Sequence, residues 1–226
     1  MTDDIGAAPG SAAYYDVLAA RLGSALLADI LDDLGVRASV MRHTIRPLSD
    51  RAVAVGRAAT MLAVDVYEPP AEPYRRLMEG LDALEPGAVV VVTTNGSTRA
   101  ALWGELLSTA VASRGGRGAV LDGFTRDARR IEAMGFPVFC TGFSPADSKG
   151  RCEVIAHGVT IEAGGVRVRP GDLVFGDRDG VVVVPQELEA DAVRRALRKA
   201  SEENRVRDAL RGGMPVTEAF RRYGVL

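Results

Sequence analysis

The sequence has few of the side chains that most metal and nucleophile motifs require. It contains two cysteines, Cys140 and Cys152, and two histidines, His43 and His157. The cysteine spacing fits neither a metal motif nor a disulfide framework, which favours a reducing compartment such as the cytoplasm. Neither histidine stands in a pattern with metal-binding or catalytic partners, so we expect structural roles for both.

Lysine is also scarce, with only Lys149 and Lys199 against 26 arginines. A Schiff-base lysine needs a desolvated setting, whereas Lys149 lies in the polar stretch SPADSKGR. A metal mechanism is therefore favoured over a Schiff base. The sequence also lacks a serine or cysteine nucleophile motif, a P-loop and a dinucleotide-binding fingerprint.

Excess positive charge and long apolar runs are absent too. The net charge is −2, without the basic stripe of a nucleic-acid-binding protein. No apolar stretch approaches the ~18–20 residues needed to cross a membrane, and the acidic N-terminal segment does not resemble a secretory signal. We therefore expect a cytoplasmic protein with no nucleic-acid or membrane partner.

What is present is the composition of an ordinary globular chain. The 226 residues are 47% hydrophobic and 26% charged, which is enough for one sizeable core. No linker, internal repeat or low-complexity segment divides the chain. We predict a flexible tail over residues 1–13 and a single domain over residues 14–226.

The middle of the chain alternates strands and helices. Gly87–Thr94 is a continuous β-branched run, typical of a strand buried on both faces. A Gly-containing loop and a helix follow, then the buried strand GAVLDG, the short helix of TRDARRIEAMG and the strand FPVFC. This order predicts a parallel sheet with crossover helices, and so an α/β fold.

Other segments flank this strand–helix–strand core. Leucine spacing predicts a helix over Tyr14–Leu34 with Gly35 as its C-cap, and Val53–Val64 indicates a strand pair or a bent strand. Beyond FPVFC, short segments between Gly, Asp and Pro predict antiparallel strands, and GDLVFGDRDG is interpreted as a β-turn instead of a calcium loop. Gln186–Arg211 predicts one long C-terminal helix. Its length suggests that it also contacts another protomer.

Two segments carry the candidate site residues. In LWGELL, Gly104 precedes a helix start, whose free N–H groups suit a carboxylate or phosphate. Alternatively, Gly104 only relieves crowding and Glu105 is a surface charge. In LDGFTRD, Arg126 offers a planar fork of donors for a carboxylate or enolate oxygen, and Asp127 offers a ligand for Mg²⁺ or Mn²⁺. Alternatively, these two are a solvated pair at a helix start.

The strands before the two segments are expected to be neighbours in the sheet. Their loops then share one end of it, the usual ligand end of an α/β sheet. An anion-binding helix start, an arginine and a metal-binding carboxylate converge there, with Glu105 or Asp122 reaching the metal through water. These groups suit a small 2-keto acid, because the metal and Arg126 stabilise the enolate formed when a C–C bond breaks.

The segments WGELLSTAVASRGGRGAVLDGFTRD, FPVFCTGFSP and VRPGDLVFGDRDGVVVVP together resemble the RraA-like family. That family includes the divalent-metal 4-hydroxy-4-methyl-2-oxoglutarate aldolases and the regulator of ribonuclease activity A, which binds and inhibits an RNA-degrading enzyme. Some members are labelled demethylmenaquinone methyltransferases. The resemblance implies a swivelling β/β/α fold, assembled as a homotrimer or a homohexamer with sites at protomer interfaces.

The resemblance also implies roles for single residues. Arg126 binds the keto or enolate oxygen, Asp127 is the direct metal ligand, Glu105 holds metal-bound water and Asp122 supports the site. The pyruvate carboxylate is held by the backbone of Gly104, Glu105, Leu106 and Leu107. A glutamate of the C-terminal helix reaches the neighbouring protomer's site in the aldolases. Glu203 matches it when counted back from LRGG, with Glu202 beside it, although the sequence beyond that motif departs from the aldolase pattern.

Together these features predict a Mg²⁺- or Mn²⁺-dependent lyase. It cleaves a 4-hydroxy-2-keto acid to pyruvate by a retro-aldol reaction and decarboxylates oxaloacetate through the same enolate. One alternative is a lyase on the same scaffold for another keto acid, suggested by the loop FSPADSKGR. The other is a non-catalytic ribonuclease-binding regulator, which is disfavoured because the family's inhibitors tend to lack the aspartate found here as Asp127.

Overall fold

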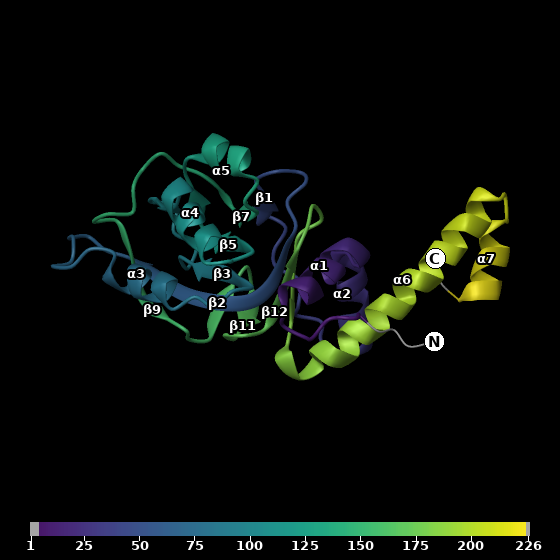
Figure 1. Cartoon of the computed structure of the whole chain (residues 1–226). Helices are drawn as coiled ribbons and strands as arrows, with labels where there is room; N and C mark the ends of the chain where they lie inside the picture. Colours follow the sequence, from purple (N-terminus) through teal and green to yellow (C-terminus); the bar gives the residue numbers. More distant parts are fainter. Residues whose placement is uncertain (1–4, 225–226) are drawn as a thin grey trace.

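The computed structural model describes residues 5–224 as an α/β fold built on one large mixed sheet (Figure 1). Its strands follow the order β1 (Arg46–Pro47), β7 (Val138–Cys140), β5 (Gly118–Asp122), β3 (Ala88–Thr93), β2 (Ala54–Asp65), β12 (Leu173–Gly176) and β13 (Val181–Val184). Strands β7, β5, β3 and β2 run parallel to one another. Strand β9 (Cys152–His157) also pairs with β2. The pairings of β9, β1, β12 and β13 with their neighbours are antiparallel. The predicted α/β class with a parallel core is confirmed.

Both faces of the sheet are covered. One face carries three helices that connect the parallel strands, α3 (Arg75–Asp82), α4 (Glu105–Ser113) and α5 (Ala128–Met134). The other face carries the hairpin of β10 (Ile161–Ala163) and β11 (Val166–Val168). Because side chains of a strand alternate between faces, the valines of β3 fill a hydrophobic cluster on each side. The prediction of a strand buried on both faces is therefore confirmed.

A second group of helices packs at the β12–β13 end of the sheet. Helices α1 (Ala12–Arg21) and α2 (Ser24–Asp33) share one hydrophobic cluster with these strands and with the start of α6 (Glu189–Arg211). Beyond this cluster α6 projects from the body of the molecule, and α7 (Val216–Tyr223) folds back along it (Figure 1). The predicted long C-terminal helix is confirmed, with a 3₁₀ turn over Gln186–Leu188 before it.

The prediction of one helix over Tyr14–Leu34 is wrong, because the chain breaks between α1 and α2 at Gly23. The Asp177 carboxylate accepts hydrogen bonds from the backbone N–H of Ser24 at 2.8 Å and from its hydroxyl at 2.6 Å. These bonds satisfy free donors at the start of α2, so a distant residue decides where this helix begins. At the other end Gly35 has a φ of +84°, as its predicted role as C-cap requires.

Two further segments agree with the sequence predictions, whereas one helix at the C-terminal end was not predicted. The segment GDLVFGDRDG forms β12 and a tight turn over residues 177–180 into β13, in agreement with its interpretation as a β-turn. Val53–Val64 falls in one long strand, β2, whose pairing with β9 shifts register between Leu62 and Ala63. Helix α7 was not expected from the sequence, although its start after Pro215 is a common site of helix initiation.

The remaining predictions concern the termini, the cysteines and membranes. Residues 1–4 of the predicted tail lie outside the described residues, and the domain boundary stays a prediction; Ile5 and Ala7 pack beside the cluster of α1. Cys140 and Cys152 are buried free thiols, and burial raises the pKa of each to about 11. Within residues 5–224, no helix combines the length and the apolar character needed to span a membrane.

Candidate functional site

A second, smaller sheet organises the candidate site. Its three parallel strands, β4 (Ala101–Trp103), β6 (Phe124–Thr125) and β8 (Gly142–Phe143), lie in that order. They are too short to show a periodic pattern, which is why the sequence did not predict them. Because parallel strands end at one edge, the residues that follow β4, β6 and β8 are brought together. These are Gly104, the pair Arg126–Asp127, and the loop that leads to Asp147.

A pocket of about 280 Å³ lies at this edge. Five residues predicted for the site line it, namely Gly104, Leu106, Leu107, Arg126 and Asp127. The two loops are tied together at their base, where the backbone N–H of Arg126 donates to the Trp103 carbonyl at 2.9 Å. The expectation that the loops after the two neighbouring strands meet is therefore confirmed, with β3 and β5 paired in parallel as anticipated.

Gly104 is the N-cap of α4 and lies directly against Asp127. A Cβ atom at Gly104 would lie 2.8 Å from Asp127 Oδ2 and 3.2 Å from Arg126 Cγ. The glycine backbone is extended, with a φ of −162°, so the requirement is for space and does not concern conformation. Asp127 Oδ2 lies 3.4 Å from the backbone nitrogen of Glu105 and accepts its hydrogen bond. The carboxylate is thus seated at the positive end of α4.

We expect Gly104→Ala to reduce the activity of this site by roughly 10²-fold, because a displacement of about 1 Å costs that much in a positioned site. The added methyl group must push the Asp127 carboxylate and the Arg126 side chain away from the helix start. Steady-state kinetics of the wild type and the variant measure the loss. Gly23→Ala is the matched control, because Gly23 is also a helix N-cap with an extended backbone (φ −135°), and its added Cβ would lie at an ordinary 3.6 Å from Asp177 Oδ2. Equal activity of all three proteins would contradict the prediction.

Arg126 is held between two carboxylates. Its Nη1 lies 3.2 Å from Asp147 Oδ1, and its Nε lies 3.7 Å from Asp127 Oδ2. The hydroxyl of Tyr74 donates to Asp147 Oδ2 at 2.9 Å. Burial and this hydrogen bond raise the pKa of Tyr74, which keeps the phenol protonated as a donor. The guanidinium is thereby fixed in direction while its side chain stays 37% exposed to the pocket.

Asp127 has an unusual backbone conformation. Its φ of +57° lies in the left-handed region, where few non-glycine residues are found, and it begins α5 as the N-cap. Such a conformation costs on the order of 1 kcal/mol and is a feature of functional sites. It places the carboxylate against Gly104 and α4. The backbone of Asp127 thus fixes the direction of its carboxylate at the edge of the pocket.

Asp122 does not join the pocket. It is buried at the end of β5, and its Oδ2 accepts hydrogen bonds from Arg42 Nη2 at 2.5 Å and from the backbone N–H of Gly164 at 2.9 Å. The carboxylate thus ties the β10–β11 turn to the sheet. Its contribution to the site in this chain is to hold the strand end, with Thr94 bonded to its backbone carbonyl.

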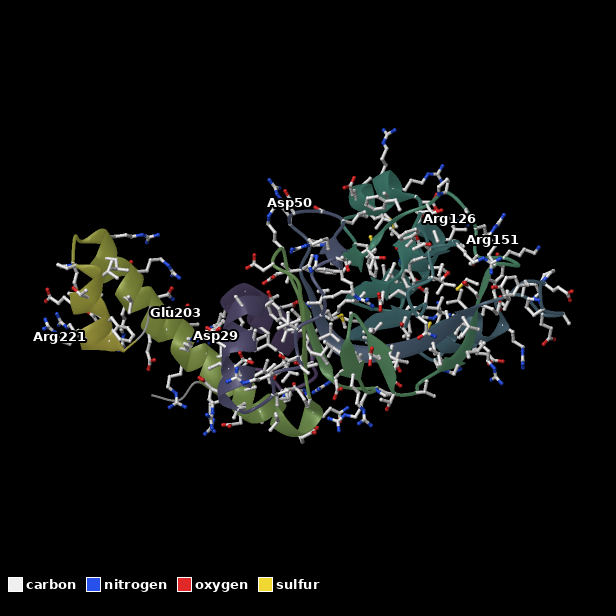
Figure 2. All side chains as sticks on the ribbon, turned by 180° about the vertical axis from the view of Figure 1, so that it is seen from behind. Asp29, Asp50, Arg126, Arg151, Glu203 and Arg221 are labelled. Atoms are coloured by element: carbon white, nitrogen blue, oxygen red, sulfur yellow. The ribbon has the colours of Figure 1, made fainter. Side chains whose placement is uncertain are left out.

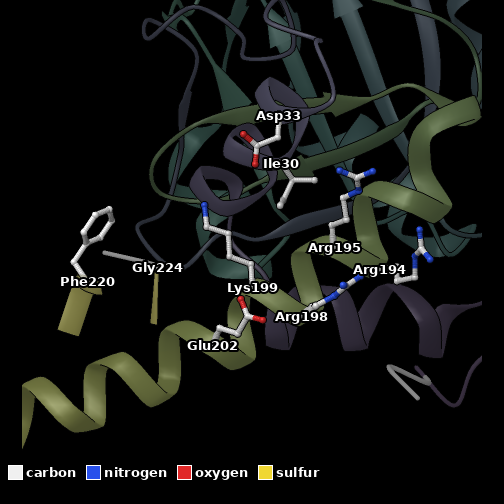
Figure 3. Close-up of a pocket in the computed structure, with 9 residues that line it drawn as sticks. All are labelled: Ile30, Asp33, Arg194, Arg195, Arg198, Lys199, Glu202, Phe220 and Gly224. Carbon is white, nitrogen blue, oxygen red and sulfur yellow. The ribbon is translucent and has the colours of Figure 1, made fainter. Parts of the chain in front are cut away.

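None of the glutamates predicted for the site lines the pocket. Glu105 is on the first turn of α4, where its carboxylate accepts a hydrogen bond from Thr109 at 3.0 Å. Figure 2 shows Glu203 on α6, far along the molecule from Arg126. Glu202 lines a separate open hollow of about 680 Å³ between α2, α6 and α7, facing Lys199 (Figure 3). In this chain neither C-terminal glutamate reaches the pocket near Arg126.

The larger hollow is less suited to chemistry than the smaller pocket. Three of its four basic side chains are paired at the surface: Arg194 and Arg195 with Asp191, and Lys199 with Asp29. Exposed pairs of this kind are common on helices and carry little energy. The smaller pocket instead joins an ion-pair network, a strained aspartate and a helix start, so we assign the candidate site to it.

Sequence reasoning missed Asp147 and Tyr74. Both line the pocket and act on Arg126, directly or through one hydrogen bond. The loop SPADSKGR had been weighed for Lys149, which does not line the pocket. A signal did exist, because this loop follows the strand FPVFC and so belongs to the same edge as the other two loops.

The donors around Asp127 suit a largely hydrated divalent ion. Among residues 5–224, no three His, Cys, Asp or Glu side chains converge on one point to hold a metal. Mg²⁺ commonly keeps several waters and binds one or two carboxylates. Asp127, 41% exposed and facing the pocket, can supply the direct ligand. Glu105, the first residue of the adjacent helix, donates its backbone N–H to Asp127 Oδ2 and so lies next to this carboxylate in space.

Comparison with known proteins now places the chain. A model of the RraA-like family, described as Aldolase/RraA, matches residues 24–183, more than half of the chain. The chain belongs to the RraA-like family. This confirms the resemblance found in its motifs, and the described architecture confirms the predicted RraA-like α/β fold with its long C-terminal helix.

Relatives within the RraA-like family carry different names. A Halalkalibacterium halodurans protein, named provisionally as a 4-hydroxy-4-methyl-2-oxoglutarate aldolase, is 30% identical over 194 residues, covering 86% of this chain and 87% of that one. Protein DlpA of Legionella pneumophila is 28% identical over 200 residues, and this chain spans 88% of its own length but 32% of DlpA. Streptomyces coelicolor RraAS2, described as an unusual member of the RNase ES inhibitor RraA family, has a TM-score of 0.74 at 34% identity, covering 83% and 92% of the two chains.

Proposed function

We propose that this RraA-like protein is a divalent-metal-dependent lyase that cleaves a 4-hydroxy-2-keto acid to pyruvate by a retro-aldol reaction. The observation that carries the proposal is the meeting of Arg126, Asp127 and the start of α4 in one pocket. An arginine fork, a carboxylate able to hold a hard cation and free backbone N–H groups are the three features that a 2-keto acid requires. The aldolase name of the Halalkalibacterium halodurans relative supports this reading.

The residues divide the work as follows. The backbone N–H groups of Leu106 and Leu107 bind the substrate carboxylate at the start of α4, and Arg126 binds the keto oxygen. A proton passes from the C4 hydroxyl through water to Glu105, the C3–C4 bond breaks, and the electron pair forms the enolate of pyruvate. Arg126 stabilises that enolate until C3 accepts a proton. Oxaloacetate would lose carbon dioxide through the same enolate.

Asp127 would hold Mg²⁺ or Mn²⁺ beside Arg126. When bound, such an ion supplies Lewis acidity to the keto oxygen and adds to the charge that stabilises the enolate. Asp127 itself is kept in direction by its left-handed backbone and by the hydrogen bond from the N–H of Glu105. The buried side chains of Leu102 and Trp103 line the pocket and keep bulk water from its base.

The proposal is tested by enolate formation and by cleavage, with protein from which metal has been removed and then restored. We expect exchange of the pyruvate methyl protons in D₂O, followed by NMR, and release of pyruvate from 4-hydroxy-2-oxopentanoate. Both should require Mg²⁺ or Mn²⁺ together with the protein. Rates no higher than those of the metal alone, in folded protein, would refute a pyruvate-enolate lyase.

Assembly is part of the same proposal. We propose a homotrimer or a homohexamer in which α6, projecting from the body of its own protomer, brings Glu203 to the pocket of a neighbour. The projection of this helix and the distance of Glu203 from Arg126 in one chain support the idea. Light scattering gives the oligomeric state, and mixed assemblies of Glu203→Gln and Asp127→Asn subunits should regain activity at complementing interfaces.

A second candidate is a ribonuclease-binding regulator, favoured by the likeness to Streptomyces coelicolor RraAS2. Such a protein would act through its surface and would not need a metal-binding carboxylate. Inhibition of a ribonuclease that survives the change Asp127→Asn would support the regulator. Loss of lyase activity in the same variant, with no ribonuclease inhibition by the wild type, would support the enzyme.

A further inference from the structure

The charges lining the pocket are uneven. Arg126 is the one cationic side chain among the described residues that line it, whereas Asp127 and Asp147 are both acidic. Arg126 already lies within 4 Å of both carboxylates. Nearby Arg151 donates to the backbone carbonyl of Asp147 at 2.9 Å and does not line the pocket. With a divalent ion on Asp127, one substrate carboxylate neutralises the charges that this protomer supplies, and a second would find no cationic partner among its described lining residues.

Asp147 is held in place on the pocket wall. The Tyr74 hydroxyl donates to its Oδ2 at 2.9 Å, its Oδ1 contacts Arg126, and the backbone N–H of Ser148 donates to Oδ1 at 2.8 Å. Tyr74 is fixed in turn, because its backbone N–H donates to the buried Glu153 at 2.6 Å. The carboxylate of Asp147 therefore cannot easily turn away from a ligand that approaches it.

Most of the pocket beyond Arg126 is apolar, with Asp147 and Ser148 as the polar exceptions. Its wall is formed by α3 on one side and by β4 and α4 on the other. The side chains that make it are Leu77, Met78, Leu102, Leu106 and Leu107, with the ring of Tyr74. Two of them, Met78 and Leu106, are 53% and 74% exposed at the rim. A ligand tail that reaches past Arg126 meets carbon atoms and the Asp147 carboxylate.

We propose that Asp147 is a specificity-determining residue that selects 2-keto acids with a neutral distal half and rejects dicarboxylates. This inference rests on the proposed function and narrows its substrate class to 4-hydroxy-2-keto acids with an uncharged substituent at C4. A second carboxylate would lie near Asp147 with no cation to pair with, and an unpaired desolvated charge is costly. 4-Hydroxy-4-methyl-2-oxoglutarate, which carries such a carboxylate, is then a poor substrate, and oxaloacetate is a weak one.

Binding of unreactive keto acids tests the inference without requiring catalysis. Trp103 is the sole tryptophan and lines the pocket, so its fluorescence reports occupancy. The dissociation constants of 2-oxohexanoate and 2-oxoglutarate are measured in the presence of Mg²⁺. We expect 2-oxohexanoate to bind at least 10-fold more tightly to the wild type, and Asp147→Asn, which keeps the shape but removes the charge, to reduce this preference at least 3-fold.

A second variant keeps the test decisive if Asp147→Asn does not fold. Met78→Lys adds a cation at the exposed rim of the pocket and is expected to reverse the preference in favour of 2-oxoglutarate. Met134→Lys, on α5 and outside the pocket, is the matched control and should leave the ratio of the two constants unchanged.

The possible results separate the two proposals. Equal binding of both keto acids by the wild type, or a ratio unchanged in both Asp147→Asn and Met78→Lys, overturns the role of Asp147 while leaving a keto-acid site in place. Failure of both keto acids to bind overturns the proposed function and this inference with it. A preference for the neutral tail that falls in Asp147→Asn or reverses in Met78→Lys supports the inference.

Discussion

Asp127→Asn is expected to abolish metal-dependent enolisation of pyruvate, with a loss of roughly 10³-fold in the rate of methyl-proton exchange. Asparagine tolerates the left-handed conformation at φ +57° and keeps the shape of the side chain. It removes the negative charge that would hold the divalent ion and balance Arg126 at 3.7 Å. The measurement is the exchange rate in D₂O at saturating Mg²⁺, followed by NMR.

The control for this prediction is Asp208→Asn, a highly exposed aspartate on α6 far from the pocket. We expect its exchange rate to equal that of the wild type. Thermal unfolding of all three proteins should show transitions within a few degrees of one another, because the change is isosteric. An Asp127→Asn protein that retains more than a tenth of the wild-type rate would rule out Asp127 as the direct metal ligand.

Arg57→Ala is expected to lower the free energy of unfolding by about 3 kcal/mol, because it leaves a buried carboxylate without its partner. Arg57 on β2 forms a two-pronged ion pair with Glu189 at the start of α6, one contact being Nη2 to Oε1 at 3.1 Å. The Glu189 side chain is only 8% exposed and also accepts a hydrogen bond from Tyr14 of α1 at 3.1 Å. Urea denaturation at one fixed protein concentration measures the change.

Two further variants give this prediction its control. Arg178→Ala breaks an ion pair with Asp50 in which both side chains are largely exposed, and should cost far less stability than Arg57→Ala. Adding Glu189→Gln to Arg57→Ala removes the unpaired charge and should recover part of the lost stability. Equal costs for Arg57→Ala and Arg178→Ala would show that the pair does not anchor α6. That anchor matters for function because it sets the direction in which α6 carries Glu203 out of the protomer.

Much of the candidate site could be predicted because its signals are local. A valine run bounded by Gly and Thr is typical of a strand buried on both faces, and two such strands in a βαβ order place their following loops at one edge. LWGELL and TRD lie in the segments that follow those strands, so Gly104, Arg126 and Asp127 could be predicted from the sequence. Gly104 begins a helix that can bind an anion, Arg126 offers a fork of donors, and Asp127 offers an oxygen ligand for a metal.

Other features could be seen only in the tertiary structure, because they depend on contacts between residues far apart in the chain. Asp177 divides the first helix in two by capping its second half, and Asp122 turns away from the pocket to hold Arg42 and Gly164. The three short strands β4, β6 and β8 are set by their pairing with one another, since two or three residues carry no periodic signal.

The sequence by itself therefore determined the α/β class, the shared edge and the pair that would bind metal and enolate, because strand burial and strand order are written in consecutive residues. The structure decided that Tyr74 and Asp147, 73 residues apart, meet over Arg126. Hydrogen bonds at such separation depend on how the loops after β4, β6 and β8 converge. Local residue preference cannot specify how these loops converge. Their convergence places the Asp147 carboxylate on the wall of the pocket.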